Sequence, residues 1–507
     1  MEYFNTVFNS RVEKLFSKEL INQVATIDTI QSASDGVSSS ELGDLLLIER
    51  RSVLNNVDKI NSIIDTISSS IPIPKIIKVE KKFFFEGSSL DAQRIIMQLI
   101  GQSTLANLCI RIVNQKSVST EQFMAERFIS SAAFYRMLQK LNDYLTPLGI
   151  HIINKRGILT VIGNEREIRY ILTGFLWRIY RGVTWPFVSI TQNEVKAVTN
   201  KLIESLGINI NNAKRDELMY ILAVNILRHR NGSTISNKEL PNYSNKLINS
   251  LLNKQYTQFK KLMTPLMDEQ NNDLIFIFIW LASLPELYLS NNLVFSFYEA
   301  LTHVEPDIVK GIDSFIDAVQ KIKNDLNLYK EKLFLSTIIS SRIAADLFPQ
   351  LTFIISSVNI YEYKDRFAPS LIPVIQRFLE TDSTLDNIQK HTLAFKYSNA
   401  FALVLPINIF EPKINIYIET DFPIYIDVQI KKELYALLST TYNIAIRESP
   451  KLPECDLAIN FNLSANSSDS EGIPRIYTHV HMSDGEKNQI LEQCRKILIR
   501  KKSQQII

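Results

Sequence analysis

Polar and basic side chains recur along one side of the segment Ser131–Leu145. Its apolar residues lie at spacing i, i+4, i+7 and i+11, the spacing of one face of an α-helix; they are Phe134, Leu138, Leu141 and Leu145. The positions off this face hold Ser131, Tyr135, Arg136, Gln139 and Lys140. Hydroxyl, amide and guanidinium groups bond to phosphate oxygens and to base edges. The segment therefore has the residue types of a helix that recognises nucleic acid.

A second helix is predicted directly before this one. Ser119 followed by Gln122 forms a capping box, which marks a helix start, and the chain turns at Ile129–Ser131. Two short helices joined by a tight turn predict a helix-turn-helix, which holds its second helix in a DNA groove. The two helices alone also fit an ordinary helical hairpin.

A β-hairpin with a basic tip is predicted after the helices. Leu148-Gly149 is a helix stop, and two apolar runs then flank Asn154-Lys155-Arg156-Gly157. Such a hairpin is the wing of a winged helix. The hairpin therefore favours the DNA-binding interpretation over the helical hairpin.

The same pattern occurs about 81 residues earlier in the chain. Ser38-Ser39-Ser40-Glu41 is again a capping box, and a turn at Ile48-Glu49 again precedes a helix. The apolar face of that helix is Val53, Val57, Ile60 and Ile64, and its other positions include Arg50, Arg51, Ser52, Asn55, Asn56 and Lys59. A second wing is predicted where Ile76–Val79 and Phe83–Phe85 flank Glu80-Lys81-Lys82. One long helix, Asp91–Asn114, is expected to open the later unit.

The middle of the chain is predicted to be almost wholly helical. A first set of five helices is expected at Glu165–Arg181, Gln192–Leu206, Ala213–Arg230, Asn245–Met267 and Asn272–Leu284. A second set is expected at Asn292–His303, Asp307–Asn324, Tyr329–Phe348, Ile360–Leu379 and Leu385–Val404. Neither set holds paired acids, Gly-rich phosphate loops or metal-ligand spacings. We therefore expect no enzyme, no catalytic residue, no cofactor and no metal site.

The last hundred or so residues change to alternating strands and helices. Strands are expected at Lys413–Ile418, Tyr442–Arg447 and Asp456–Phe461, with helices at Gln429–Ser439 and Asp484–Lys501. The fold class is thus mainly α and multidomain, with two N-terminal winged helix-turn-helix units, two five-helix bundles and a small C-terminal α/β domain with a parallel sheet. The expected domains are 1–90, 91–165, 166–288, 289–404 and 405–507.

Composition limits the function classes only weakly. A formal charge of +3 and a pI of about 8.4 do not by themselves indicate a nucleic-acid-binding protein. Evidence for such binding must therefore come from where the basic residues lie along the chain. Cys109, Cys455 and Cys494 are scattered, which argues against a disulfide framework or a zinc site and favours a cytoplasmic location. The most apolar run, Leu274–Leu284, is shorter than the roughly 20 residues of a membrane span, so no membrane association is expected.

Taken together, these segments resemble the Mga/AtxA family of bacterial virulence regulators over essentially the whole chain. The most specific piece is FMAERFISSAAFYRMLQKLNDYLTPLGIHI, which is similar to the second helix-turn-helix of that family. The helical sets resemble phosphotransferase-system (PTS) regulation domains, and the end resembles an enzyme IIB domain. The resemblance implies an activator of virulence or metabolic genes that binds double-stranded promoter DNA. It also implies a homodimer or higher oligomer formed through the C-terminal domain, and tuning by a PTS phosphocarrier protein through histidine phosphorylation.

The end domain departs from the enzyme IIB pattern. Such carriers have a cysteine in a Gly-rich loop after the first strand, whereas Ile418–Pro423 contains neither and carries two acids that would repel phosphate. Cys455 precedes the third strand, which is the wrong place. We therefore expect a non-catalytic association surface. The apolar stripe of the closing helix is expected to pack on its own sheet or, as the alternative, on a second subunit.

Three histidines are candidates for phosphorylation. His391 is preferred, His303 lies in the same helical set, and His229 stands between Arg228 and Arg230 at a helix end. A solvated helix terminus is the alternative for His229, and a structural role is the alternative for His391.

Residue types divide the expected DNA contacts into two groups. Phosphate contacts are expected from Arg50, Lys59, Lys81, Lys82, Arg136, Lys140, Lys155 and Arg156. Base or close-groove contacts are expected from Arg51, Ser52, Asn55, Ser131, Ala132 and Tyr135. The rival hypotheses are a phosphotransferase-system phosphocarrier and a protein-interaction scaffold.

Overall fold

A computed structural model describes residues 10–68, 72–268, 271–289, 293–322, 327–350, 368–448, 454–461 and 472–505. The chain divides into two compact bodies. The larger comprises Met1–Ile316, Asn324–Ile360 and Asp382–Leu393, and the other comprises Asp317–Lys323, Tyr361–Thr381 and Ala394–Ile507. Most of the described residues are helical, with small antiparallel sheets near the start and a parallel sheet near the end, as predicted.

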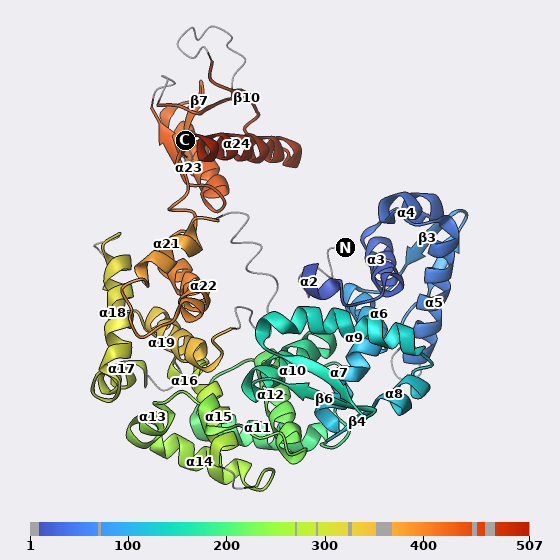
Figure 1. Cartoon of the computed structure of the whole chain (residues 1–507). Coiled ribbons are helices and arrows are strands. Elements are labelled where there is room, and N and C mark those ends of the chain that lie inside the picture. The colour runs from blue at the N-terminus through green and yellow to red at the C-terminus, as the bar shows by residue number, and fades with distance from the viewer. Residues whose placement is uncertain are drawn as a thin grey trace. The chain divides into compact units, whose positions relative to one another are not determined.

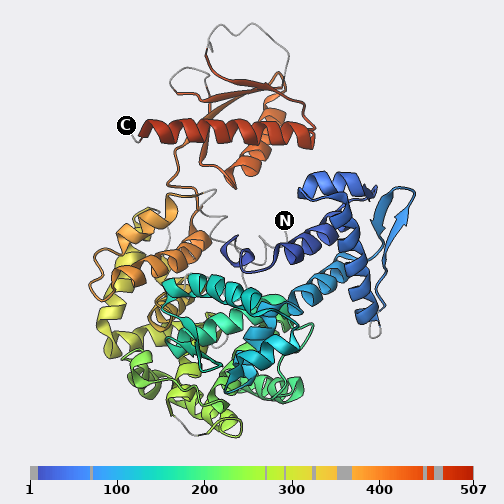
Figure 2. The ribbon, with the colours of Figure 1, turned by 45° about the vertical axis from the view of Figure 1, so that its right-hand side comes forward.

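The first winged-helix unit opens the larger body (Figure 1). Its helices are α3 (Lys18–Ser32), α4 (Ser39–Leu46) and α5 (Arg50–Ser68), after a short α2 (Ser10–Glu13). Its antiparallel sheet has the order β1 (Val37–Ser38), β3 (Lys82–Phe85), β2 (Ile76–Val79). The predicted apolar face of α5 forms the core, because Val53, Ile60 and Ile64 are fully buried. The hairpin β2–β3 runs beside α5 (Figure 2).

The second winged-helix unit repeats this arrangement. Its helices are α7 (Thr104–Asn114), α8 (Thr120–Glu126), α9 (Ser131–Leu145) and a 3-10 turn, η1 (Thr146–Leu148). Its sheet has the order β4 (Val118–Ser119), β6 (Ile158–Ile162), β5 (His151–Lys155). The four apolar residues predicted on one face of α9 are all buried. Both predicted units therefore contain the expected helices and a small antiparallel sheet.

The prediction of one long helix at Asp91–Asn114 is wrong. The segment forms α6 (Ser89–Gly101) and α7, which are bent by 71° at the break. The break occurs because Ser103 caps a new helix, its hydroxyl accepting a hydrogen bond from the Ala106 amide at 3.2 Å. As a result α6 packs against α3, α5 and α10, whereas α7 packs against α10 and α12.

The first helical set follows in the same body. It comprises α10 (Glu165–Tyr180), α11 (Gln192–Leu206), α12 (Asn212–Arg230), η2 (Asn237–Glu239), α13 (Ser244–Leu251), α14 (Asn253–Met263), α15 (Asn271–Ala282) and α16 (Glu286–Leu289). The predicted helix Asn245–Met267 is wrong, because the chain leaves the helical conformation at Leu252, which is 2% exposed and turns inward. The apolar run from Leu274 is buried in α15, as expected. Within the described ranges no single helix meets the length and apolarity of a membrane span, although the bent pair α6–α7 does so jointly.

The second helical set is divided between the two bodies. Its described helices are α17 (Leu293–Val304), α18 (Pro306–Gln320), η3 (Leu328–Lys330), α19 (Lys332–Leu347), α21 (Leu371–Phe378) and α22 (Asn387–Val404). Part of the predicted helix from Ile360 lies outside the described residues. The division between the bodies falls within α18 and α22, and the five predicted domain boundaries stay predictions.

The C-terminal domain contains a four-stranded parallel sheet. The strand order is β10 (Arg475–Tyr477), β9 (Leu457–Asn460), β7 (Ile414–Glu419), β8 (Ile444–Arg447), with helices α23 (Ile424–Ser439) and α24 (Asp484–Gln505). Strand β10 was not predicted. The apolar stripe of α24 packs on its own sheet, since Ile490, Cys494 and Ile497 are buried in the same core as the strands. This confirms the expected packing of the closing helix.

Candidate nucleic-acid interface

The helices of the two winged-helix units correspond at an offset of 81 residues, from Ser38 to Ser119. Each of these serines is the N-cap of its first helix. The Ser38 hydroxyl accepts a hydrogen bond from the Glu41 amide at 3.2 Å, and the Ser119 hydroxyl accepts one from the Gln122 amide at 3.3 Å. Both predicted N-terminal caps are therefore confirmed.

The turn that follows has an unusual backbone in both units. Leu47 has φ 53° and Phe128 has φ 51°, so both lie in the left-handed region. Only glycine takes this conformation without steric cost, and for other L-residues it costs about 1–2 kcal/mol. Their side chains are also 90% and 97% exposed. An exposed apolar residue in a strained turn thus occurs twice, at equivalent positions.

Each recognition helix is tied to its wing by one asparagine. In the first unit the Asn61 amide donates to the Ile76 carbonyl at 3.0 Å and accepts from the Ile76 amide at 2.8 Å. In the second unit Asn142 makes the same pair of bonds to Ile152, at 2.8 Å and 2.7 Å. Sequence reasoning missed both residues, although an offset of 81 aligns them, 61 with 142. These bonds fix the orientation of each wing relative to the helix that precedes it.

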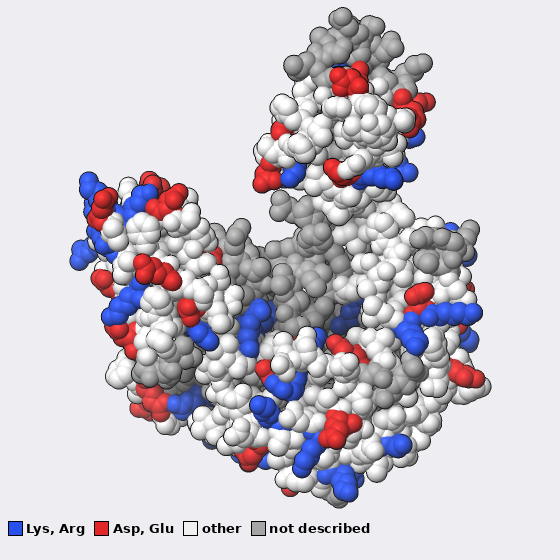
Figure 3. Space-filling model, turned by 180° about the vertical axis from the view of Figure 1, so that it is seen from behind, with Lys and Arg blue, Asp and Glu red and all other residues white. Residues whose placement is uncertain are grey.

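The expected contact residues are exposed on these elements. Among the expected base contacts, Ser52 is half-buried and the others are exposed: Arg51, Asn55, Ser131, Ala132 and Tyr135. All eight expected phosphate contacts are exposed: Arg50, Lys59, Lys81, Lys82, Arg136, Lys140, Lys155 and Arg156. Basic side chains alternate with acidic ones over the first unit, at the left of Figure 3. The surface is therefore one of scattered positive groups, in keeping with the small net charge.

The structure brings three of these basic residues to one groove. The groove has a volume of 670 Å³ and runs between the two winged-helix units. Lys59 of α5 lines it together with Arg136 and Lys140 of α9. Lys59 also forms an exposed ion pair with Glu19, at 3.4 Å. The groove thus places basic side chains from both recognition helices around one space, together with the Glu19 carboxylate that pairs with Lys59.

The second unit has an additional link between its helix and its wing. The Asn154 side chain donates to the Tyr135 hydroxyl at 2.9 Å and accepts from the Gly157 amide at 2.8 Å. Arg156 and Gly157 form the turn of the wing, with φ 52° and 82°. In the first unit Leu54 stands at the position that corresponds to Tyr135, so this link has no counterpart there.

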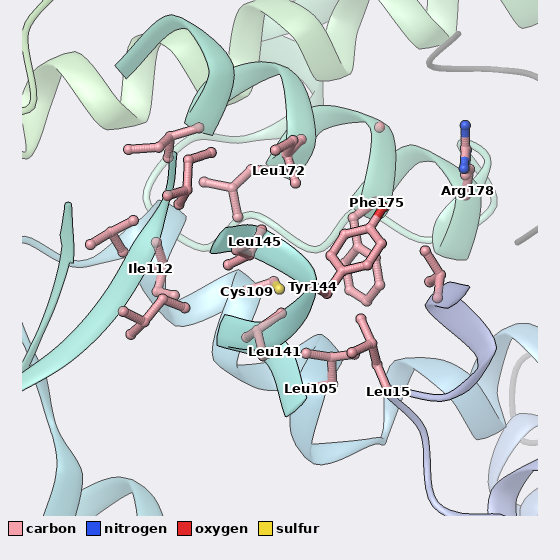
Figure 4. Close-up of a pocket in the computed structure, with 17 residues that line it drawn as sticks. Leu15, Leu105, Cys109, Ile112, Leu141, Tyr144, Leu145, Leu172, Phe175 and Arg178 are labelled. Carbon is pink, nitrogen blue, oxygen red and sulfur yellow. The ribbon is translucent and has the colours of Figure 1, made fainter. Parts of the chain in front are cut away.

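The buried face of α9 rests on the first helix of the bundle. Leu141 and Leu145 of α9 line an apolar cavity of 70 Å³, together with Cys109 of α7 and Leu172 and Phe175 of α10 (Figure 4). Burial raises the pKa of the Cys109 thiol to about 12, so it stays protonated at neutral pH. An apolar layer thus joins the second recognition helix to α10.

A buried charge network joins the same unit to the bundle. Glu165 of α10 accepts hydrogen bonds from Arg169 at 3.0 Å and from Arg228 of α12 at 2.6 Å and 2.9 Å. Arg169 also pairs with Asp273 of α15. Arg228 in turn donates to the Ile112 carbonyl at the end of α7, at 3.2 Å. The last turn of α7 is therefore capped by a side chain of the helical bundle.

His229 lies inside this network, so the alternative of a solvated helix terminus is wrong. Its side chain is 4% exposed and its Nδ1 atom is 3.4 Å from Asp273 Oδ2. It is buried because the end of α12 is covered by packing against α10 and α15. His303 on α17 and His391 on α22 are exposed. Of the three candidate histidines, only these two are open to a phosphate donor.

The polar groups in and around the loop after β7 form hydrogen bonds and an ion pair with neighbouring elements of the same domain. The Thr420 hydroxyl donates to Asp427 at 2.9 Å, Lys431 pairs with Asp427 at 2.8 Å, and Asn460 donates to Glu419 at 2.5 Å. The Lys431 ammonium holds the pKa of Asp427 below its usual value. Cys455 is 2% exposed, and burial raises its pKa. The described residues contain no cluster of three or more histidines, cysteines or acids suited to a metal ion.

Comparison with known proteins agrees with this geometry. Residues 88–176, which span the second winged-helix unit and most of α10, match the family model described as the Mga helix-turn-helix domain. The chain is also 21% identical over 220 residues to a putative trans-acting regulator of Streptococcus pneumoniae serotype 4, covering 43% of each chain. It is 19% identical over 239 residues to the capsule synthesis positive regulator AcpB of Bacillus anthracis, covering 45% of this chain and 47% of that one. The matches thus span less than half of either relative, and they confirm the resemblance to Mga-family regulators.

Proposed function

We propose that this chain, which carries an Mga helix-turn-helix domain and is a distant homologue of Mga-family trans-acting regulators, is a DNA-binding transcriptional regulator. The observation that supports this most strongly is the duplicated winged helix. Both copies expose basic and polar side chains on the recognition helix and hold the wing with the same asparagine. AcpB is described as a positive regulator. By analogy, we propose that this chain is a cytoplasmic activator of virulence or metabolic genes.

In this proposal each recognition helix enters a major groove and each wing lies along the neighbouring backbone. The basic residues at the wing tips and along the helices neutralise phosphates, and the residues at the helix starts face the base edges. The groove lined by Lys59, Arg136 and Lys140 holds a phosphate of the DNA between the two units. The scattered charge favours modest sequence discrimination, with DNA shape and bendability contributing.

We propose that histidine phosphorylation by the phosphotransferase system acts at His391 rather than at His229. His391 is exposed near the start of α22, two residues after Gln389, whose amide donates to Asp346 at 3.4 Å. Asp346 also accepts from the Tyr243 hydroxyl at 2.8 Å, next to α13. A phosphate on His391 would add negative charge to the first turns of α22, the helix that carries Gln389. Incubation with a PTS phosphocarrier protein should label the wild-type chain, and His391→Ala should remove the label while His303→Ala keeps it.

We also propose that the C-terminal domain associates with a second copy of the chain. Helix α23 exposes Ile424, Tyr425, Val428 and Tyr435, at 77%, 72%, 42% and 49%. Such an apolar stripe on a charged domain is typical of an association surface. Tyr425→Lys should lower the mass in solution toward that of a monomer, whereas Lys432→Ala on the same helix should not.

The experiment that tests DNA binding is capture of chromosomal fragments by the full chain. The test variant combines Arg50→Ala, Arg51→Ala, Lys155→Ala and Arg156→Ala, and it should recover few fragments. The matched control removes Lys196 and Lys201, exposed lysines of α11, and should recover as many as the wild type. Equal recovery by the wild type, the test variant and the control variant would show that the winged helices do not bind the DNA.

A further inference from the structure

Leu47 and Phe128 stand apart from the other apolar residues of the structure. They have the highest exposed fractions, 90% and 97%, among the large hydrophobic residues of the described ranges. They are also the only apolar residues among the described non-glycine residues with positive φ. Turns of helix-turn-helix units often contain glycine, which accepts this backbone freely. Glycine or asparagine would therefore suit the fold better at both positions, so folding does not explain the residues that are present.

Their position indicates what they contact. Leu47 precedes Arg50, the first residue of α5, by three positions, and Phe128 precedes Ser131, the first residue of α9, by three positions. The N-terminal part of a recognition helix is the part that contacts base edges. In the major groove the apolar feature of a base pair is the 5-methyl group of thymine, which apolar side chains contact.

The surroundings of Phe128 disfavour a protein partner. The exposed residues near it in the sequence are Ala125, Glu126, Ser130 and Ser131, which are small or polar, whereas near Leu47 the exposed residues include Leu45. Protein interfaces need a contiguous buried patch of several hundred square ångströms on each side. A contact with one thymine methyl needs a single apolar side chain, which is what the turn offers.

We infer that Leu47 and Phe128 each make an apolar contact with a thymine methyl group at the edge of the DNA groove. This inference rests on the proposed DNA-binding function. The strained turns hold the two side chains outward at the start of each recognition helix, beside residues that face the base edges. The contact adds a preference for thymine to a surface whose other contacts are mainly with phosphates.

The test compares two residues at position 128 on two kinds of DNA. Phe128→Asn accepts the left-handed backbone, so its melting temperature should be no lower than that of the wild type. A chromosomal fragment bound by the full chain is prepared once with thymine and once with uracil, which lacks the methyl group. The wild type should lose about sixteenfold in affinity on uracil DNA, about fourfold for each of the two methyl contacts. Phe128→Asn should lose at least about fourfold on thymine DNA, and on uracil DNA it should lose only the further fourfold that belongs to the Leu47 contact. Phe128→Leu, the residue type of the first unit, should recover most of the affinity.

Several outcomes would overturn the inference while leaving the proposed function in place. One is a wild-type chain that binds both DNAs equally. Another is a Phe128→Asn chain that binds thymine DNA as tightly as the wild type, or that loses only transcription activation, which would assign the residue to a protein contact. A full chain that binds no chromosomal fragment would instead contradict the proposed function itself.

Discussion

The two winged-helix units have similar exposed helix starts and wings but differ in how their buried faces are packed. In the first unit α3 and α5 pack against α6. In the second, α7 is capped by Arg228 of the bundle and α9 shares an apolar layer with α10. The exposed helix starts and wings are thus repeated, whereas the support differs in kind. The first unit contacts α10 through α6 and through the stacked rings of Phe16 and Phe175, and the second has in addition a charged side chain of the bundle at the end of α7.

The largest expected effect breaks the link between the second unit and the bundle. Glu165→Ala leaves Arg169 and Arg228 buried without the carboxylate they share, and removing one member of a buried ion pair costs about 3–5 kcal/mol. Hydrogen exchange should show the amides of α7 opening more easily by that free energy.

The matched control lies in the first unit. Glu19→Ala removes the exposed partner of Lys59, and exposed ion pairs contribute about 0–1 kcal/mol. Exchange in α3 should be almost unchanged. An equally large loss of protection in α3 would mean that the two units do not differ in how they are supported.

A smaller and equal effect is expected where the units agree. Asn61→Ala and Asn142→Ala each leave the amide and the carbonyl of a wing isoleucine without a side-chain partner. Each variant should destabilise its wing by about 1–3 kcal/mol, because a buried polar group without a hydrogen bond is costly. Exchange protection of β2 and β5 would measure this. Loss at only one of the two sites would contradict the correspondence of the units.

The sequence predicted the parts of this comparison that depend on local signals. Capping serines and apolar spacing predicted α4, α5, α8 and α9, because each signal lies within one helix. The break at Ser103 was missed, since the apolar positions continue through it and only the serine cap marks it. The bonds of Arg228 to Glu165 and to Ile112 span 63 and 116 residues. The spacing of apolar residues along the chain gives no information about contacts between such distant residues. The burial of His229 and the contacts of the second unit with the bundle could therefore not be predicted.

The next smaller effect sharpens a difference at the wing. Tyr135→Phe removes the hydroxyl that accepts from Asn154, and a hydrogen bond of this kind contributes about 0.5–1.5 kcal/mol. DNA affinity should fall by up to about tenfold, while Leu54→Phe at the corresponding place in the first unit should leave it unchanged. The affinities of the two variants for one DNA fragment would be compared by calorimetry or by a gel-shift assay.

The salt dependence of DNA affinity tests the central claim, that both units contact DNA, most directly. Three variants of the full chain are compared: Arg50→Ala with Lys59→Ala, Arg136→Ala with Lys140→Ala, and the control Lys196→Ala with Lys201→Ala. Each lost phosphate contact should reduce the slope of log affinity against log salt by about 0.9. The account predicts slopes lower by about 1–2 for both of the first two pairs and an unchanged slope for the control. Unchanged slopes for either winged-helix pair, or an equal decrease in the control, would contradict the claim that both units hold the DNA.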